Sequence, residues 1–397
     1  MPPANDQNWC PFRPTTDNLK TIAQDVAEIP TIQQTTNTRD PHLCFPDRVA
    51  HQYQVAGGRV LFQVENNLPA CLQGIGLFQP GAEYTGIGRI STGLGVPHLE
   101  TNPDFLGIMT AFLTPGGQRV DFLGINDPTS PADNHRDFMS VLHATGESAG
   151  VEVPFVGQLG GRDLINLAAQ QTVFGQALAQ RMGAVKAVQT LAHLTRQTLR
   201  TCRSSTAYQT YWTGIVETGD TGGKFTFVPV VDENHLPGLE PGERYLSEEW
   251  KRRQLAGDIV FQLYLIPFLD EARTPTRALT DRWDEESKQR VGRIVFPQTE
   301  PNSDEAGLWS SLAAEMGANP ANWIANRENS VREPATEFGN ARKLAYQKSQ
   351  EGRRALAPET YQSTFQTGRI SPELARELSR RRSEKTAAGH VDHAPSA

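Results

Sequence analysis

The sequence predicts an α+β protein built around an antiparallel β-sheet or barrel. Its 397 residues include 34 Gly and 27 Pro, a composition that suits short strands joined by turns better than a helical bundle. Short runs of β-branched and aromatic residues recur along most of the chain, separated by turn signals such as Pro-Gly-Gly at 115–117. Two stretches of strong helix formers, at 161–202 and from Asp304 onward, predict added helices.

The elements are expected in a simple order. Residues 1–40 are polar, with a short helical pattern near 19–29, and predict an arm that lies on the domain. A core at 41–356 follows, in which the strands come first and a helical segment begins at about 304. Residues 357–397 predict a basic helix and a tail that is disordered from Glu384. Strands are expected at 59–65, 84–90, 105–113, 120–125, 211–217, 224–231, 258–268 and 291–296, and helices at 161–202, 309–316, 341–354 and 371–382.

Charge and cysteine content exclude several classes of protein. The net charge of −7 argues against a nucleic-acid-binding protein. No run of eighteen apolar residues is present, so no membrane span is expected. The cysteines are far apart and form no metal-binding spacing, which predicts reduced thiols in a cytoplasmic protein. The sequence leaves a homo-oligomer open.

Two residues on the predicted helix at 341–354 could form a metal site. Arg342 and Tyr346 stand four residues apart, on one face of the helix. A free tyrosine has a pKa of about 10 and is neutral at pH 7. A guanidinium bonded to its oxygen, together with a ferric ion bound to it, can hold the side chain ionised. Such a pair is more often an ordinary surface or core contact, although tyrosine is one of the few proximal haem ligands that proteins use.

A second group of fragments lies in the first part of the chain. Arg48 and His51 stand three residues apart in a predicted loop, and a lone histidine in a loop is more often a hydrogen-bonding residue than a catalyst. The segment Arg89-Ile-Ser91-Thr lies in a predicted strand, and the segment from Asp121 to Pro128 reads Asp-Phe-Leu-Gly-Ile-Asn-Asp-Pro. The pair Asp-Phe at 137–138 follows. Each fragment is weak by itself.

Together, and in this order, these fragments resemble the core of haem catalases and their catalase-like relatives. That family has an Arg three residues before its distal His, then an Arg-Phe-Ser-Thr strand, an Asp-x-x-Gly-Asn-Asn-x-Pro segment and a Phe that stacks on the haem. The later segments at 211–231, 291–296 and 319–322 resemble a hairpin, a strand and a proximal segment of the family. Arg342-x-x-x-Tyr346 is similar to its proximal helix, with Arg353 seven residues further on. The resemblance covers residues 42–355 in patches.

The resemblance implies an antiparallel β-barrel core of the haem-catalase type with added helices, and a haem b cofactor with its iron. Tyr346 would bind the iron, and Arg342 would keep it ionised. His51 would be the distal base, oriented by Ser91. The remaining cofactor-binding residues would be Phe138 on a pyrrole and three arginines on the propionates, namely Arg48, Arg89 and Arg353.

One departure from the family concerns the distal side. The Asn that many members place beside the distal His corresponds to Ile125, and Asn126 stands one place further on. Asn126 is kept as a candidate catalytic residue, although a one-residue shift on a strand directs its side chain away unless a bulge intervenes. An apolar residue at this position, with the small Ala50 beside His51, favours a substrate larger than hydrogen peroxide.

The expected function is therefore that of a haem-dependent oxidoreductase acting on a peroxide. The substrate would be hydrogen peroxide with an apolar organic co-substrate, or an organic or lipid hydroperoxide, as in catalase-related peroxidases. Three alternatives remain open: an ordinary hydrogen-peroxide-disproportionating catalase, a non-catalytic haem-binding protein on the same fold, and a haem-free lipocalin-like barrel whose arginines bind an anion. The chain lacks the long carboxy-terminal extension of larger catalases, so NADPH binding is not expected.

Overall fold

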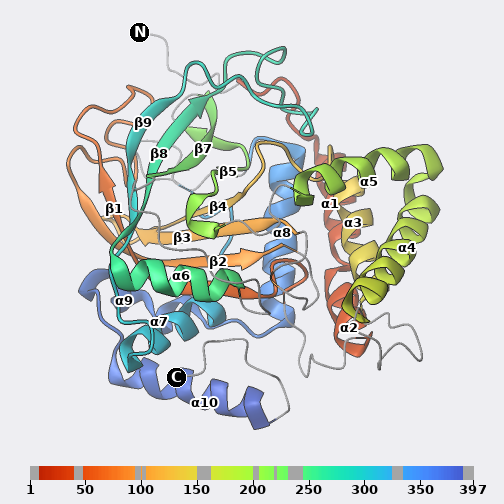
Figure 1. The fold of residues 1–397 in the computed structure, drawn as a ribbon. Coiled ribbons are helices and arrows are strands. Elements are labelled where there is room, and N and C mark those ends of the chain that lie inside the picture. The colour runs from red at the N-terminus through yellow and green to blue at the C-terminus, as the bar shows by residue number, and fades with distance from the viewer. Residues whose placement is uncertain are drawn as a thin grey trace.

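The fold is a closed antiparallel barrel with helices packed on its outside (Figure 1). The computed structural model describes residues 9–39, 48–93, 100, 104–149, 162–199, 205–218, 221–230, 245–323 and 334–387. Within these residues the strands pair in the order β5-β4-β3-β2-β1-β9-β8-β7-β6. Strand β5 also pairs with β7, which closes eight strands into a barrel and leaves β6 beside β7. The strands are β1 (Gln54–Val64), β2 (Glu83–Thr92), β3 (Leu106–Leu113), β4 (Arg119–Ile125), β5 (Tyr211–Thr213), β6 (Val216–Thr218), β7 (Thr221–Pro229), β8 (Ile259–Pro267) and β9 (Gln289–Phe296).

The inside of the barrel is filled by aromatic side chains. Side chains alternate along a strand, so one set of residues faces inward and the next faces outward. Phe62, Phe112 and Phe122 are fully buried inside and contact one another edge to face or at a tilt. Phe225 and Trp323 extend the same cluster. The interior is therefore a packed core.

The helices form two groups around the barrel (Figure 1). Helix α8 lies between the barrel and a group made of α1 to α5, and it contacts α1, α2 and α3. Helices α7, α9 and α10 cover another side, below the barrel in the view of Figure 1. The helices are α1 (Thr16–Val26), α2 (Ile29–Arg39), α3 (His135–Ser148), α4 (Arg162–Met182), α5 (Ala184–Leu199), α6 (Tyr245–Ala256), α7 (Asp304–Glu315), α8 (Glu337–Gly352), α9 (Gln362–Thr367) and α10 (Pro372–Ala387), with short 3-10 turns at Thr206–Tyr208 and Pro358–Thr360.

The predicted fold class is confirmed, and several predicted elements differ in detail. The polar N-terminal region contains two helices whose residues Ile22 and Ile29 are fully buried in a cluster with α3 and α8. The C-terminal helix continues past Glu384 to Ala387, and the rest of the predicted tail lies outside the described residues. The predicted strand at 211–217 is two short strands, β5 and β6. Among the described cysteines, Cys10 and Cys71 are free thiols; Cys44 and Cys202 lie outside the described residues.

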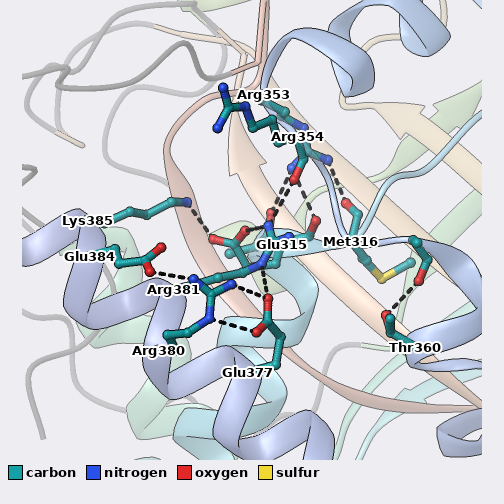
Figure 2. Close-up of polar contacts among 12 residues, drawn as sticks. Glu315, Met316, Arg353, Arg354, Thr360, Glu377, Arg380, Arg381, Glu384 and Lys385 are labelled. Atoms are coloured by element: carbon teal, nitrogen blue, oxygen red, sulfur yellow. Dashed lines mark hydrogen bonds and ion pairs between the residues drawn. The ribbon is translucent and has the colours of Figure 1, made fainter.

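Helix α10 is attached to the end of α7 by ion pairs around Glu315 (Figure 2). The buried Glu315 carboxylate accepts from Arg381 at 3.1 Å and from Lys385 at 2.5 Å. Its pKa is lowered: burial would raise it, and the charges of Lys385 and its neighbours outweigh that effect. Arg381 also donates to the carbonyl of Arg354 at 2.9 Å, next to the end of α8. The C-terminal helix thus braces the ends of α7 and α8. No described helix has both the length and the apolar surface needed to cross a bilayer.

Candidate haem-binding site

A cavity of about 240 Å³ lies between the outer face of the barrel and helices α3 and α8. This is far more than the 10–15 Å³ that a single water needs. Its barrel wall comes from residues of β2, β3, β4, β5 and β7, and the loop at 48–51 closes one side. Each predicted site residue except Asn126 lines it: Arg48, His51, Arg89, Ser91, Phe138, Arg342, Tyr346 and Arg353.

Three outward-facing residues form a row across neighbouring strands on the distal wall. Ser91 on β2 is paired with Gly107 on β3, and Gly107 is paired with Ile125 on β4. Paired residues in an antiparallel sheet point to the same face. Ile125 therefore occupies the place beside Ser91 that faces the cavity.

The imidazole of His51 lies on this row. Its Nδ1 and the Ser91 hydroxyl are hydrogen-bonded at 3.1 Å. A Cβ on Gly107 would meet the ring at 2.6 Å, so only glycine leaves room for it. The His51 backbone has a φ of 58°, in the left-handed region, which costs a non-glycine residue about 1–3 kcal/mol. Its amide donates to the carbonyl of Gly93 at 2.9 Å, which helps to hold this backbone in place.

Electrostatics keep this imidazole neutral. Burial lowers the pKa of His51 from 6.5 to about 4, and the charges of Arg89, Arg342 and Arg48 act in the same direction. The buried carboxylate of Asp104 opposes them. At neutral pH the ring therefore carries no charge and can accept a proton. In the described part of the chain its Nε2 makes no hydrogen bond.

Arg89 fixes the loop that carries His51. Its Nη2 donates to the carbonyls of His51 at 2.7 Å and Gln52 at 3.0 Å, and its Nε donates to Gln54 at 3.2 Å. Gln54 in turn donates to the carbonyl of Ser310 on α7 at 3.0 Å. Arg89 thus has a structural part in the distal wall besides the propionate contact that was predicted for it.

The opposite wall is helix α8. Thr336 caps its start by accepting from the amide of Gly339 at 3.0 Å, and no proline follows until Pro358. Phe338, Arg342 and Tyr346 are spaced four residues apart and all line the cavity, as the helical period requires. The ring of Phe338 meets Phe138 of α3 edge to face, with ring centroids 5.4 Å apart. Phe138 therefore lies on the cavity wall beside the proximal helix.

The expected hydrogen bond between Arg342 and the Tyr346 hydroxyl is not formed. The guanidinium carbon lies 5.8 Å from the centre of the Tyr346 ring. Its Nη1 lies against Gly214, at a place that a Cβ would fill. The rotamer of Arg342 is thus set by a glycine distant in the sequence, which the helical spacing could not reveal.

Arg48 and Arg353 meet at the C-terminal end of α7. Arg48 donates to the carbonyls of Ala314 at 2.7 Å and Met316 at 3.3 Å, and Arg353 donates to the carbonyl of Met316 at 2.7 Å. Figure 2 shows Arg353 reaching Met316. Arg353 is the C-cap of α8 and not a residue within the helix, a small correction to the predicted boundary. The two guanidiniums place positive charge on the same edge of the cavity.

Asn126, the third candidate catalytic residue, does not line the cavity. Its side chain accepts from the amide of Leu106 at 2.8 Å and donates to Gln209 at 3.4 Å. The described residues around the cavity include Ile125 and Asp127, and Asn126 is not among them. No bulge lies between β3 and β4, where the pairing from Gly107 to Leu113 is continuous, so the alternation of the strand directs Asn126 away.

A buried network ties the barrel to the proximal helix. Asp121 accepts from Arg119 at 2.7 Å, from the amide of Asn319 at 2.9 Å and from the side chain of Asn322 at 2.7 Å. Burial raises the pKa of Asp121, although the charge of Arg119 opposes this. Asn319 then donates to the carbonyl of Lys343 on α8 at 3.0 Å. This network positions the helix that carries Tyr346.

The donor set of the cavity suits a haem. A phenol on one wall and a neutral imidazole on the other can lie on opposite faces of a flat macrocycle. Arg48 and Arg353 on one edge suit two carboxylates, and Phe138 supplies an aromatic ring. The described residues contain no group of three His, Cys, Asp or Glu side chains that could hold a metal ion.

Several residues of the cavity were not predicted. Phe338 could have been found, because it stands eight residues before Tyr346 on the same helical face. Gly107 gave no signal, since its part depends on strand pairing. Asp104, which acts on the pKa of His51 without lining the cavity, gave none either. Lys224 was read only as part of a strand, and it lines the cavity from β7.

Comparison with known proteins shows the fold. No family model and no curated protein matches the sequence. In structure the chain is similar to catalase A from Saccharomyces cerevisiae, with a TM-score of 0.57, 16% identity and coverage of 80% of this chain and 63% of that chain. It is also similar to a fungal catalase (TM-score 0.55, 15% identity, 81% and 61% coverage) and to a bacterial catalase (TM-score 0.52, 17% identity, 78% and 58% coverage).

The protein therefore has the fold of the catalases, a closed antiparallel barrel with added helices. The chain spans 58–63% of the length of these three proteins. The resemblance seen in the sequence is confirmed at the level of the fold.

Proposed function

We propose that this protein is a haem-dependent oxidoreductase that acts on a peroxide, with Tyr346 as the iron ligand and His51 as the distal base. The observation that carries the proposal is the single cavity lined by both residues, with Arg48 and Arg353 on its edge, in a chain with the catalase fold. Bound haem would supply a ferric centre that activates peroxide and exchanges electrons with it.

The distal residues would move one proton. His51 is neutral at pH 7, so it can take the proton of a hydroperoxide at Nε2 and return it to the departing oxygen. The Ser91 hydroxyl at Nδ1 and the close contact with Gly107 hold the ring in one orientation. The strained backbone at His51 is consistent with a position selected for function.

The proximal and edge residues would bind the cofactor. Tyr346 would hold the iron, and Arg342 beside its ring would favour the ionised phenol. Arg48 and Arg353 would pair with the propionates, exchanging some of their carbonyl contacts for charged ones. Phe138 would contact the macrocycle.

The distal wall favours an organic hydroperoxide over hydrogen peroxide. Ile125 offers no hydrogen bond at the place beside His51, and Ala50 leaves room. A small polar peroxide would bind weakly against such a wall, whereas an apolar chain would gain from burial. Disproportionation of hydrogen peroxide is the second candidate, supported by the complete His51–Ser91 pair.

Turnover by the haem-loaded protein tests the proposal. We expect kcat/KM for a linoleic acid hydroperoxide to exceed that for hydrogen peroxide by at least about tenfold, and His51→Ala to lose about 100- to 10,000-fold with both. Ile125→Asn should raise the activity with hydrogen peroxide. His143→Ala is a control, because His143 is paired with Glu28 outside the cavity. Absence of turnover with either peroxide, or activity unchanged in His51→Ala, would refute the proposal.

A further inference from the structure

Lys224 places a positive charge on the cavity wall, and the proposed peroxide reaction does not use it. Lys224 lies on β7 between the buried residues Gly223 and Phe225, is 5% exposed, and lines the cavity together with Trp212 and Leu279. Within the described part of the chain, its ammonium makes no hydrogen bond and no ion pair. Its one described partner is the ring of Trp283, whose centre lies 4.8 Å from Nζ. Lysine is almost never buried without a charged partner, so this arrangement requires an explanation.

Glu285 and Asp127 act on the pKa of Lys224, but neither carboxylate forms an ion pair with its ammonium. Burial lowers the pKa of Lys224 to about 8, while Glu285 and Asp127 raise it. Asp127 accepts from the amide and the hydroxyl of Thr129. Glu285 accepts from the indole of Trp212 at 2.9 Å and from Lys288 at 3.4 Å. Because its pKa remains above 7, Lys224 is mostly charged at neutral pH, with three donors that the described residues leave unused.

This charge is separate from the arginines assigned to the cofactor. Arg48 and Arg353 lie at the end of α7, and Arg89 lies on β2 against the His51 loop. Around the barrel, β7 is separated from β2 by β3, β4 and β5 in one direction. The charges that act on His51 include Arg48, Arg89 and Arg342, whereas those that act on Lys224 are Glu285 and Asp127. An anion at Lys224 would therefore not be a propionate held by those arginines.

The surroundings of Lys224 indicate which anion would fit. One ammonium balances one negative charge, and the two nearby carboxylates would repel a dianion such as phosphate more strongly than a monoanion. Ile125, which lies in the row with Ser91 and Gly107, pairs with Trp212 on β5, and Trp212 pairs with Thr226, two residues from Lys224 on β7. The cavity wall from His51 to Lys224 therefore includes the apolar side chains of Ile125 and Trp212, and Leu279 lines the same cavity. A monoanionic head with an apolar chain would satisfy both features.

We propose that Lys224 binds the carboxylate of the organic substrate, which is then a carboxylic acid with an apolar chain. The apolar chain would lie along Ile125 toward His51. The distance from the carboxylate at Lys224 would then determine at which carbon of the chain a hydroperoxide group lies beside His51. That the ligand is a substrate rests on the proposed function, whereas the carboxylate site itself does not.

Ligand binding to the purified full-length protein tests the site without any turnover. Trp212 and Trp283 lie beside Lys224, so quenching of tryptophan fluorescence can report binding. We expect dodecanoate to bind about 10- to 100-fold more tightly than its methyl ester at pH 7. This preference should be lost in Lys224→Met and retained in Lys224→Arg. It should also decline above about pH 8, as the ammonium loses its proton.

Lys288→Met is the matched control. It removes the positive charge of Lys288, which is paired with Glu285 at 3.4 Å and does not line the cavity. It should keep the preference. Equal binding of acid and ester by the wild-type protein, or a preference that survives Lys224→Met, would overturn the inference. If Lys224→Met does not fold, the wild-type comparison and its pH dependence still decide. A retained preference without peroxide turnover would leave the carboxylate site standing and refute only the proposed function.

Discussion

His51 has the properties of a base whose ring is hydrogen-bonded to a hydroxyl group and not to a carboxylate. Its Nδ1 is engaged by the Ser91 hydroxyl, and burial with three arginines nearby keeps the ring neutral. A folded-state pKa below the ordinary value means that protonation begins only at acid pH. The imidazole is then ready to accept a proton over the whole neutral range.

The pH dependence of turnover follows from this pKa. We expect kcat/KM to be constant from about pH 5.5 to pH 8 and to fall below that range with a midpoint near pH 4, as His51 takes up a proton and can no longer act as a base. A stopped-flow profile with the haem-loaded protein measures it. A midpoint near 6.5, the value of an unperturbed histidine, would contradict the assignment of a buried, neutral His51.

Adding a single methyl group at Gly107 tests whether the position of the His51 ring matters for turnover. A Cβ there would lie 2.6 Å from the His51 ring and 3.1 Å from the Ser91 hydroxyl, so Gly107→Ala should displace the imidazole. We expect a loss of peroxide turnover of about 100-fold, because the base would no longer be aligned. Gly307→Ala on α7 is the control, since a Cβ there meets nothing within 4 Å. Full activity of Gly107→Ala would show that His51 does not need this position.

At the scale of elements, the site depends on how α8 is held against the barrel. The helix presents Phe338, Arg342 and Tyr346 to the cavity on one face. Besides its packing against α1, α2 and α3, the helix is held by the Asp121 network at its side and by the end of α7 at its C-terminus. The helix and the barrel wall are therefore fixed relative to each other by polar contacts that are mostly buried.

Asp121→Asn tests this connection. It would leave the buried guanidinium of Arg119 without its carboxylate, which typically costs about 3–5 kcal/mol when one partner of a buried pair is removed. We expect the free energy of unfolding in urea to fall by about that amount, and haem retention to weaken with it. Glu351→Gln removes an exposed pair with Lys348 on the same helix and should cost less than about 1 kcal/mol. Equal effects of the two substitutions would show that the network does not hold α8.

For the whole molecule, the barrel acts as a rigid wall and the site lies outside it. Aromatic side chains fill the interior, so the outward-facing residues of β2, β3 and β4 are free to form the cavity under α8. The cavity thus lies between the sheet and helices α3 and α8, whose arrangement beside the barrel Figure 1 shows.

Much of this arrangement could be predicted from the sequence, because it depends on the spacing of residues along helices and strands and on the order of the motifs. The four-residue spacing of Arg342 and Tyr346 placed both on one wall of the cavity. The alternation of side chains along β4 placed Ile125 toward the cavity and Asn126 away from it. The rotamer of Arg342 could not be predicted, because its Nη1 lies against Gly214, in the connection between β5 and β6, far away in the sequence. A helical pattern was predicted near 19–29, where α1 lies, but α2 was not predicted. The burial of the few apolar residues of both helices could not be predicted, since it depends on contact with α3 and α8. Lys224 was missed because the sequence does not distinguish an outward-facing strand residue that lies in solvent from one that lines a cavity.

The central claim is that Tyr346 holds a haem iron in this cavity. Titration of the purified protein with haem, followed by absorption and electron paramagnetic resonance, tests it most directly. We predict a Soret band with a high-spin ferric spectrum in the wild-type protein, and loss of the tyrosinate signature in Tyr346→Phe. Lys343→Met, on the same helix but not lining the cavity, should bind haem as the wild type does. A protein without a Soret band, or a Tyr346→Phe spectrum identical to that of the wild type, would contradict the claim.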